Sequence, residues 1–205
     1  MTTDFGRFRL GYKTHQGPRE TNQDKVLSIA LPGDRWLLAV ADGMGGLEEG
    51  ELASQTALGS LYQSLSDGST LLDAAQNANA AVTKKADGRM MGTTLVAAVV
   101  SGRQAESVNV GDSRAYQSDL LGLIQVTHDH TVAYEAERTG MPLSGGEADD
   151  STPWGTALAR YLGEGPEVEV DQFGPLDLIQ GGWLLLCSDG LHNVVSADEM
   201  DTLLA

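Results

Sequence analysis

Three aspartates stand at the ends of apolar runs in this chain, and their side chains are the ones best suited to chemistry. Asp42 and Asp189 each end such a run and precede a glycine, and Asp112 follows a third run and Gly111. Carboxylates held close together raise one another's pKa and need compensation, which a divalent cation supplies. Oxygen ligands without His or Cys at zinc spacing favour Mg²⁺ or Mn²⁺, and a pair of such ions promotes in-line displacement at phosphorus.

The same residues also have an ordinary explanation. Asp-Gly is a common tight-turn pair, and either Asp42 or Asp189 alone could be no more than that. Arg19 suits bidentate binding of a phosphate beside metal ions, but a lone arginine in a polar stretch is more often a surface residue. These residue types by themselves leave both interpretations open.

The composition excludes several classes of function. The chain has 29 acidic and 13 basic residues and a formal charge of -16, whereas binding to nucleic-acid phosphates needs clustered Lys and Arg. Its longest apolar stretch, Leu95 to Val100, is far below the roughly 20 residues that span a bilayer. The single cysteine, Cys187, lies in an apolar run and fits a small buried side chain in a reducing compartment. We therefore expect a cytoplasmic protein that binds neither nucleic acid nor membrane.

Apolar spacing predicts the elements that must position these aspartates. Residues 50–65 form an amphipathic pattern, and a second helix is predicted to start at the capping-box pair Thr70 and Asp73. Short apolar runs predict strands, with antiparallel pairing between the second and third of them. The predicted strands are 36–41, 95–100, 107–110, 168–171 and 183–188. Further predictions are a loop at 43–46, a short helix over 129–139 and a surface loop at 143–153.

Six short motifs occur in the order found in bacterial metal-dependent serine/threonine protein phosphatases of the type 2C class, which the chain resembles from about Gly11 to its end. The motifs are Arg19-Glu20-Thr21-Asn22-Gln23-Asp24, Ala41-Asp42-Gly43-Met44-Gly45-Gly46, Gly92-Thr93-Thr94, Asn109-Val110-Gly111-Asp112-Ser113-Arg114, Thr127-His128-Asp129-His130 and Leu186-Cys187-Ser188-Asp189-Gly190-Leu191. Each motif is weak alone, but six in order are a strong signal.

The resemblance implies an α+β fold, a four-layer α-β-β-α sandwich of two antiparallel sheets flanked by helices. It implies a metal site with two or three Mg²⁺ or Mn²⁺ ions at one end of the sandwich. We expect one phosphatase domain over residues 1–205, with a mobile flap at about 131–153 that modulates substrate access.

Metal-binding roles are also implied by the resemblance. Asp42 is similar to the carboxylate that bridges both metals, with the backbone carbonyl of Gly43 as a further ligand. Asp189 is similar to a ligand of one metal, and Asp24 to an acid that holds metal-bound water. Asp112 is similar to the ligand of a third, weaker metal.

The remaining roles concern phosphate binding and proton transfer. Arg19 resembles the phosphate clamp, whereas Thr93 and Thr94 are expected to stabilise a strand entry. Eukaryotic relatives have a histidine at the position of Met44, so the group that protonates the leaving oxygen is not identified. The four histidines are candidates in principle only, and two of them, on either side of Asp129, are expected to be structural. They are His15, His128, His130 and His192.

The function implied is hydrolysis of phosphoserine or phosphothreonine in proteins by metal-activated water, without a covalent intermediate. The partners would be a phosphorylated protein and a cognate Ser/Thr kinase pathway, and the protein is expected to be a monomer. An alternative is a shortened, weakly active or inactive homologue that binds phosphoproteins as a regulatory module. A third interpretation is a soluble α/β domain in which the Asp-Gly turns have no role in function.

The end of the chain departs from the family pattern. The family ends with an Asp-Asn turn and an apolar strand, and that aspartate is a metal ligand. Here a capping box formed by Ser196 and Glu199 starts a helix that stops at Ala205. We expect that about 40 further residues, enough for a helix and a strand, are missing through truncation or natural shortening. The site would then lack one carboxylate.

Overall fold

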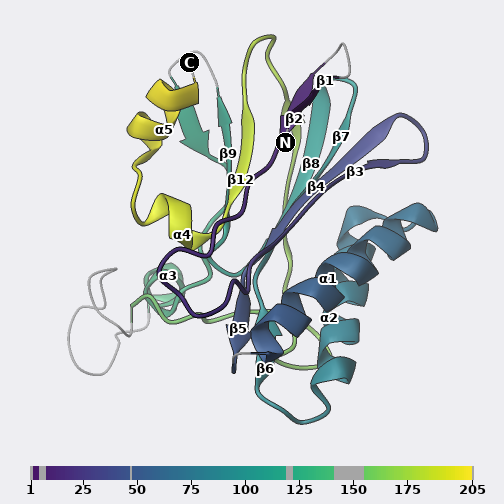
Figure 1. The fold of residues 1–205 in the computed structure, drawn as a ribbon, viewed down its shortest axis with the longest axis vertical. Helices are drawn as coiled ribbons and strands as arrows, with labels where there is room; N and C mark the ends of the chain where they lie inside the picture. Colours follow the sequence, from purple (N-terminus) through teal and green to yellow (C-terminus); the bar gives the residue numbers. More distant parts are fainter. Residues whose placement is uncertain (1, 5–7, 47, 119–121, 141–154, 205) are drawn as a thin grey trace.

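A computed structural model of the chain describes residues 2–4, 8–46, 48–118, 122–140 and 155–204. Its centre is an antiparallel sheet of five strands in the order β11-β8-β7-β4-β3 (Figure 1). The strands are β3 (Lys25–Leu31), β4 (Arg35–Ala41), β7 (Leu95–Ser101), β8 (Gln104–Val110) and β11 (Asp171–Asp177). The middle strand, β7, is buried from Leu95 to Val100, which explains its uninterrupted apolar sequence.

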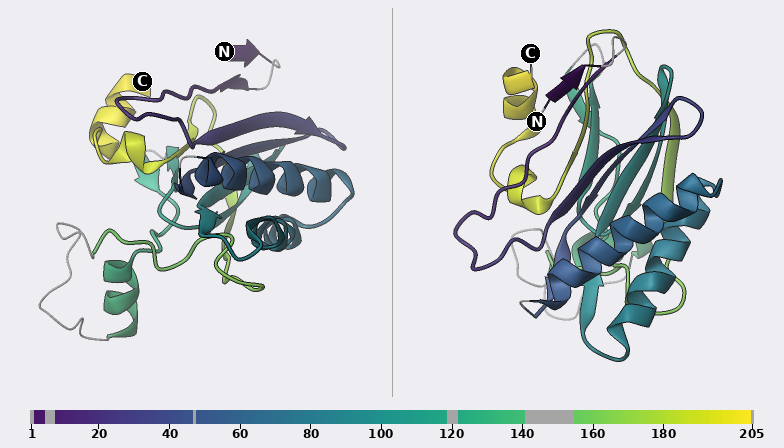
Figure 2. Two further views of the ribbon diagram at one scale, coloured as in Figure 1. Left: turned by 60° about the horizontal axis from the view of Figure 1, so that its bottom comes forward. Right: turned by 45° about the vertical axis from the view of Figure 1, so that its right-hand side comes forward.

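Two long helices cover one face of this sheet (Figure 2). They are α1 (Glu49–Ser66) and α2 (Leu71–Ala86), which confirms both predicted helices. Thr70 caps α2, because its side chain accepts a hydrogen bond from the backbone N–H of Asp73, at 3.1 Å. The apolar faces of the two helices and the inner face of the sheet form the largest core of the molecule.

A second antiparallel sheet, with the order β10-β9-β12, packs on the other face of the five-stranded sheet. Its strands are β9 (Arg114–Ser118), β10 (Leu123–Gln125) and β12 (Leu184–Cys187). Val40 and Val96 from the first sheet and Ala115 from the second are buried together between the two.

Two short helices form the outer layer on this side, α4 (Asp189–His192) and α5 (Ala197–Leu204). Met200 of α5 packs on Tyr116 and Cys187 of the second sheet. Ser196 and Glu199 form the expected capping box, since each backbone N–H is bonded by the other's side chain. Helices, sheet, sheet and helices follow one another in space, so the predicted four-layer sandwich is confirmed.

The remaining elements are small. Strands β1 (Thr2–Asp4) and β2 (Arg9–Gly11) form one antiparallel pair, and β5 (Gly43–Gly45) and β6 (Met91–Thr93) form another. Helix α3 (Val132–Thr139) protrudes from the body of the molecule (Figure 2). None of the helices in the described part of the chain is long and apolar enough to cross a bilayer.

Three local predictions are wrong. In each case a strand pairing or a helix cap set different bounds from those predicted. The segment 43–46 was expected as a loop, but pairing with β6 makes its first three residues a strand. The strand expected at 168–171 instead begins at Asp171, where pairing with β8 begins. The helix expected from Asp129 begins at Val132, because Thr131 caps it. The loop predicted at 143–153 lies wholly outside the described residues, as does most of the predicted flap.

Candidate metal centre

Asp42 directly follows β4, and its backbone is fixed from both sides. Its N–H donates to the Thr94 hydroxyl at 3.0 Å. Its carbonyl accepts hydrogen bonds from the Thr93 hydroxyl and from the Thr94 N–H, both at 2.9 Å. The two threonines therefore hold the main chain from which the Asp42 carboxylate projects.

Asp24 lies beside Asp42 because of the strand register. Lys25 of β3 pairs with Ala41 of β4, so the next residue beyond each of them lies at the same end of the sheet. The carboxylate of Asp24 also accepts a hydrogen bond from the Ser188 hydroxyl at 2.8 Å. This bond joins the end of the first sheet to the end of β12.

Asp112 follows a turn that only glycine fits well. Gly111 has φ +106°, and a Cβ at this position would lie 2.6 Å from the Thr94 side chain. Its N–H donates to His130 Nδ1 at 3.1 Å, and its carbonyl accepts from the His130 N–H at 2.9 Å. His130 is fully buried, which fits the structural role expected for it.

Asp189 is the first residue of α4. Because Cys187 pairs with Arg114, the end of β12 lies next to the segment that carries Asp112. The ring of His192, at the end of α4, has Nε2 3.0 Å from the backbone carbonyl of Asp112. The two strand ends that carry Asp112 and Asp189 are thus joined directly.

The electrostatics confirm that these four acids share one environment. Burial, followed by the charges of Asp24 and Asp189, raises the pKa of Asp42 to about 8, and a hydrogen bond between the carboxyl groups of Asp24 and Asp42 adds to the shift. Burial and the charge of Asp189 raise the pKa of Asp112 to about 6. Asp42 and Asp112 thus resist ionisation beside the charges of their neighbours, and a cation would stabilise the ionised group.

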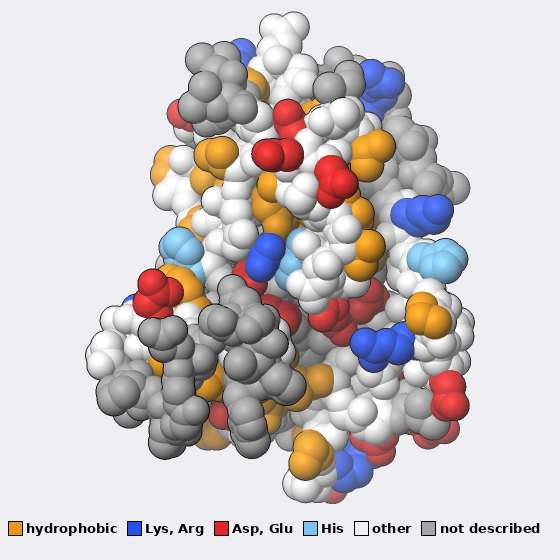
Figure 3. Space-filling model, turned by 90° about the vertical axis from the view of Figure 1, so that its left-hand side faces the viewer, with side chains coloured by type: hydrophobic (Ala, Val, Ile, Leu, Met, Phe, Trp, Pro, Cys, Tyr) orange, Lys and Arg blue, Asp and Glu red, His pale blue; other side chains and the backbone are white. Residues whose placement is uncertain are grey.

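The donor set fits a hard divalent cation. It consists of carboxylate oxygens, which Mg²⁺ and Mn²⁺ prefer, and acidic side chains gather in a hollow on the face that carries α4 and α5 (Figure 3). Among the described residues, however, no three His, Cys, Asp or Glu side chains stand close enough to enclose an ion by themselves. The site is therefore open rather than closed around an ion. We call its four acids, Asp24, Asp42, Asp112 and Asp189, the acidic rim.

The residue after Asp42 must be a glycine, because there is no room for a side chain at position 43. A Cβ on Gly43 would lie 2.0 Å from the carbonyl oxygen of Gly50, near the start of α1. The close approach of α1 to β5 therefore requires glycine here and keeps the peptide after Asp42 against the helix.

Arg19 is the one predicted site residue that the structure does not bring into contact with the acids. It lies exposed in a turn that Gln16 closes by donating to the Arg19 carbonyl at 2.8 Å. Its side chain pairs with no carboxylate of the described residues. As far as the described residues go, its side-chain donors are available for another anion.

Two further residues were assessed for chemistry from the sequence. Burial raises the pKa of Cys187 to about 12, so this thiol is not a nucleophile at neutral pH. His128 stacks on Tyr134 with ring centroids 5.5 Å apart, as expected of a structural histidine. Asp129, next to it, binds Arg114 through two guanidinium nitrogens, at 2.7 to 3.0 Å.

From the sequence, Ser188 was given no role at the site, and His192 was considered only as one of four candidate proton donors. Ser188 could have been noticed because it stands between an apolar strand and Asp189, where a helix-capping hydroxyl is common. The contact of His192 with Asp112 has no sequence signal, since its partner is a backbone carbonyl 80 residues away.

A cavity of about 520 Å³ opens beside this rim, between β12 and the strands β3 and β4. Its walls are largely apolar, with Val26 and Val40 on one side and Leu184 and Leu186 on the other. Asp24 lines the cavity as well, so the space reaches the acidic rim.

Comparison with known proteins gives a consistent result. The family described as Protein phosphatase 2C matches residues 13–204. The "Serine/threonine phosphatase stp" of Listeria monocytogenes is 36% identical over 216 residues, which cover 98% of this chain and 81% of the relative.

Two crystal structures are similar in both sequence and fold. The PPM Ser-Thr phosphatase MsPP from Mycobacterium smegmatis, in complex with cacodylate, is 37% identical with a TM-score of 0.73, over 87% of this chain and 77% of that one. The catalytic domain of the serine/threonine protein phosphatase PstP, in complex with 2 manganese ions, is 32% identical with a TM-score of 0.66, over 91% and 77%.

Proposed function

Since the chain belongs to the protein phosphatase 2C family and is a metal-dependent serine/threonine protein phosphatase, we propose that Asp42, Asp189 and Asp24 form its catalytic metal site. Asp42 would bridge two ions with the Gly43 carbonyl as a further ligand, and Asp112 would hold a third ion more weakly. The observation that carries this proposal is the meeting of four acids at one end of the sandwich, through the β3–β4 register and the bonds of Ser188 and His192. In agreement with it, burial and the surrounding acids raise the pKa of Asp42 to about 8. Either Mg²⁺ or Mn²⁺ suits these oxygen donors.

Bound ions would supply a hydroxide at neutral pH and positive charge for the phosphoryl oxygens. The residues of the chain contribute the rest. Asp42 must release its proton to bind an ion, because only the ionised carboxylate is a ligand. Asp24, held by Ser188 at 2.8 Å, would accept a hydrogen bond from water at the site.

Arg19 is proposed as the phosphate clamp. Its guanidinium has donors in a planar fork that matches two phosphate oxygens. Two features support the assignment, which are its exposure and the lack of a carboxylate partner among the described residues. Its loop leads directly to Asp24, so the proposed clamp and this acid belong to one continuous segment.

The cellular setting is proposed on the same basis. The substrate is a phosphorylated protein, and we infer that a cognate serine/threonine kinase produces it. The excess of 29 acidic over 13 basic residues favours a site that selects its substrate by the phosphate and the ions rather than by a basic surface. We place the protein in the cytoplasm as a monomer.

The proposal is tested with a phosphothreonine peptide. The purified protein should release phosphate when Mn²⁺ is added and lose this activity with chelator, and Asp42→Asn should lower kcat/KM by about 10³-fold, or about 4 kcal/mol. Arg19→Ala should mainly raise KM for the peptide. Calorimetric titration should show Mn²⁺ binding to the wild type and much weaker binding to Asp42→Asn.

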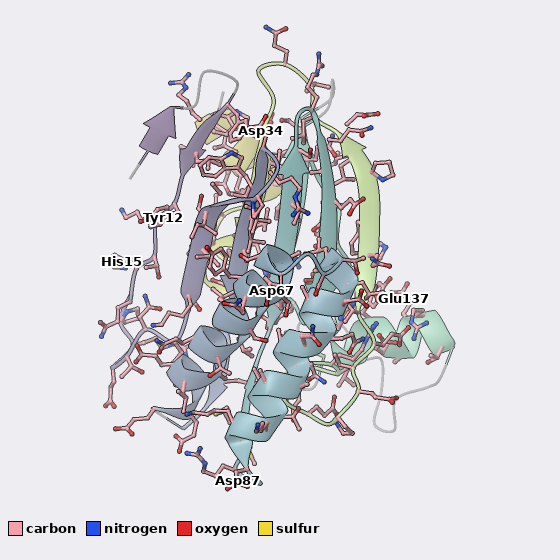
Figure 4. The ribbon with its side chains drawn as sticks, turned by 90° about the vertical axis from the view of Figure 1, so that its right-hand side faces the viewer. Tyr12, His15, Asp34, Asp67, Asp87 and Glu137 are labelled. Carbon is pink, nitrogen blue, oxygen red and sulfur yellow. The ribbon has the colours of Figure 1, made fainter. Side chains whose placement is uncertain are left out.

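Asp34→Asn is the matched control. Asp34 precedes β4 and Asp42 follows it, so the two acids lie at opposite ends of one strand (Figure 4). Asp34 has φ +56°, a conformation that asparagine tolerates. Its variant should keep full activity. Turnover that ignores both the chelator and Asp42→Asn would refute the metal site, and binding of phosphopeptide without turnover would favour a regulatory module.

A further inference from the structure

His192 makes a contact that the proposed reaction does not use. It is the last residue of α4, a single turn that begins with Asp189. Its ring crosses to the neighbouring strand end and places Nε2 3.0 Å from the Asp112 carbonyl oxygen. One histidine therefore joins the backbone of one acid to the helix that carries another.

The polarity of this contact is fixed by chemistry. A carbonyl oxygen only accepts hydrogen bonds, so Nε2 carries the proton and donates. The other ring nitrogen, Nδ1, is buried and has no partner among the described residues. The bond to the Asp112 carbonyl is therefore the polar contact that the described residues show for this ring.

The segment that His192 holds is constrained on its other side as well. Gly111, directly before Asp112, exchanges two hydrogen bonds with His130. Because Gly111 has a positive φ, the Asp112 peptide sits after a turn whose direction depends on these contacts. Two histidines, one on each side, thus fix the direction of the Asp112 backbone.

We propose that His192 is a positioning residue that sets the separation between the carboxylates of Asp112 and Asp189. The inference rests on the proposed function, in which these two acids bind metal. Ser188, at the other end of the same turn, makes a comparable bond to Asp24 at 2.8 Å. The segment 188–192 therefore holds one acid of each neighbouring loop by one side-chain hydrogen bond and carries a third acid itself.

The consequence concerns ions bound between Asp112 and Asp189. Groups that orient metal ligands without touching the metal commonly change its affinity by about 10- to 100-fold. Loss of the His192 hydrogen bond frees the Asp112 peptide to rotate and widens the range of distances between the two carboxylates. Asp24 and Asp42, held by the β3–β4 register, are not affected.

Two substitutions separate the hydrogen bond from the volume of the ring. His192→Gln keeps an N–H donor close to the position of Nε2, whereas His192→Leu fills the space without a donor. Val194→Gln, at a neighbouring residue that is 79% exposed, is the control. Calorimetric Mn²⁺ titration should show that His192→Leu weakens the weaker binding event about tenfold, with His192→Gln and Val194→Gln close to wild type. In activity assays the Mn²⁺ concentration for half-maximal rate should rise more than kcat falls.

A measurement without metal tests whether His192 holds the Asp112 backbone, independently of metal binding. Amide hydrogen exchange in chelator should be faster around Asp112 in His192→Leu and unchanged in His192→Gln, while the metal-free melting temperatures of all variants stay close to that of wild type. Unchanged exchange in His192→Leu, or equal effects of Leu and Gln, would overturn the inference. Failure of the wild type to bind Mn²⁺ would instead overturn the proposed function.

Discussion

The α1–α2 layer and the α4–α5 layer cover the sandwich from opposite sides, but they bury very different amounts of apolar side chain. Ala57 and Leu61 of α1 are 0% exposed, and Leu65 is 1% exposed. In α5, Met200 is buried while Leu203 is 79% exposed. The cavity of about 520 Å³ also lies on the α4–α5 side, along β12.

The difference extends to the acidic rim. The well-packed half supplies Asp24 and Asp42, whose positions follow from a seven-residue strand pairing and from two threonine hydroxyls. The thinner half supplies Asp189 from a four-residue helix, tied to its neighbours by single hydrogen bonds from Ser188 and His192. The positions of Asp24 and Asp42 are thus fixed by the sheet, whereas the position of Asp189 can change at small energetic cost.

The largest expected effect is on metal-free stability as a function of pH, because burial and the neighbouring acids disfavour the charged form of Asp42. The pKa of Asp42 is raised to about 8 in the folded protein, above an ordinary value of about 3.9 for the unfolded chain. The folded state therefore retains a proton that the unfolded state has lost, and stability falls as pH rises from about 4 to about 8. The loss should be on the order of 5 kcal/mol.

Urea unfolding of chelated protein across this pH range measures the effect. Asp42→Asn, which keeps a neutral group at the same place, should flatten most of the profile, and added Mn²⁺ should restore stability at high pH. A wild-type stability that rises over the same range would show that folding does not raise the pKa of Asp42.

The next effect compares the two cores directly. Leu61→Ala removes a fully buried side chain from the α1 face and should cost about 4 kcal/mol. Met200→Ala should cost about 2 kcal/mol, because its neighbours Leu185 and Leu204 are only partly buried and can close over the gap. Leu203→Ala, at an exposed position of α5, should stay within about 0.5 kcal/mol. Equal costs for Leu61→Ala and Met200→Ala would contradict the comparison.

The smallest effect compares the hydrogen bonds at the rim. Thr93→Val and Ser188→Ala each remove one hydroxyl, worth about 1 kcal/mol. The Asp42 carbonyl keeps its bond from the Thr94 N–H, so Thr93→Val should lower stability with little change in Mn²⁺ affinity. Asp24 loses the donor from Ser188, and Ser188→Ala should weaken Mn²⁺ binding about tenfold. Calorimetry and melting curves on both variants test this, and a reversed order would refute it.

Much of the fold could be predicted because its signals are local. The helix spacing of Leu58, Leu61 and Leu65, and the Thr70 cap, depend on residues within two turns of one another. The strand β5 could not be predicted in this way, since Gly-Met-Gly has no strand propensity and forms one only against β6. The start of β11 was likewise decided by β8 rather than by its own alternation.

The candidate site divides in the same manner. The sequence by itself determined which acids stand at strand ends, where short apolar runs stop, and it placed Asp42 and Asp189 there. The tertiary structure decided that Asp24 lies beside Asp42, that the strand ends carrying Asp112 and Asp189 meet, and that His192 joins these two ends. The reason is physical: a strand end follows from the local run of apolar residues, whereas neighbours across a sheet depend on register and chain crossing, to which no short stretch of sequence is sensitive.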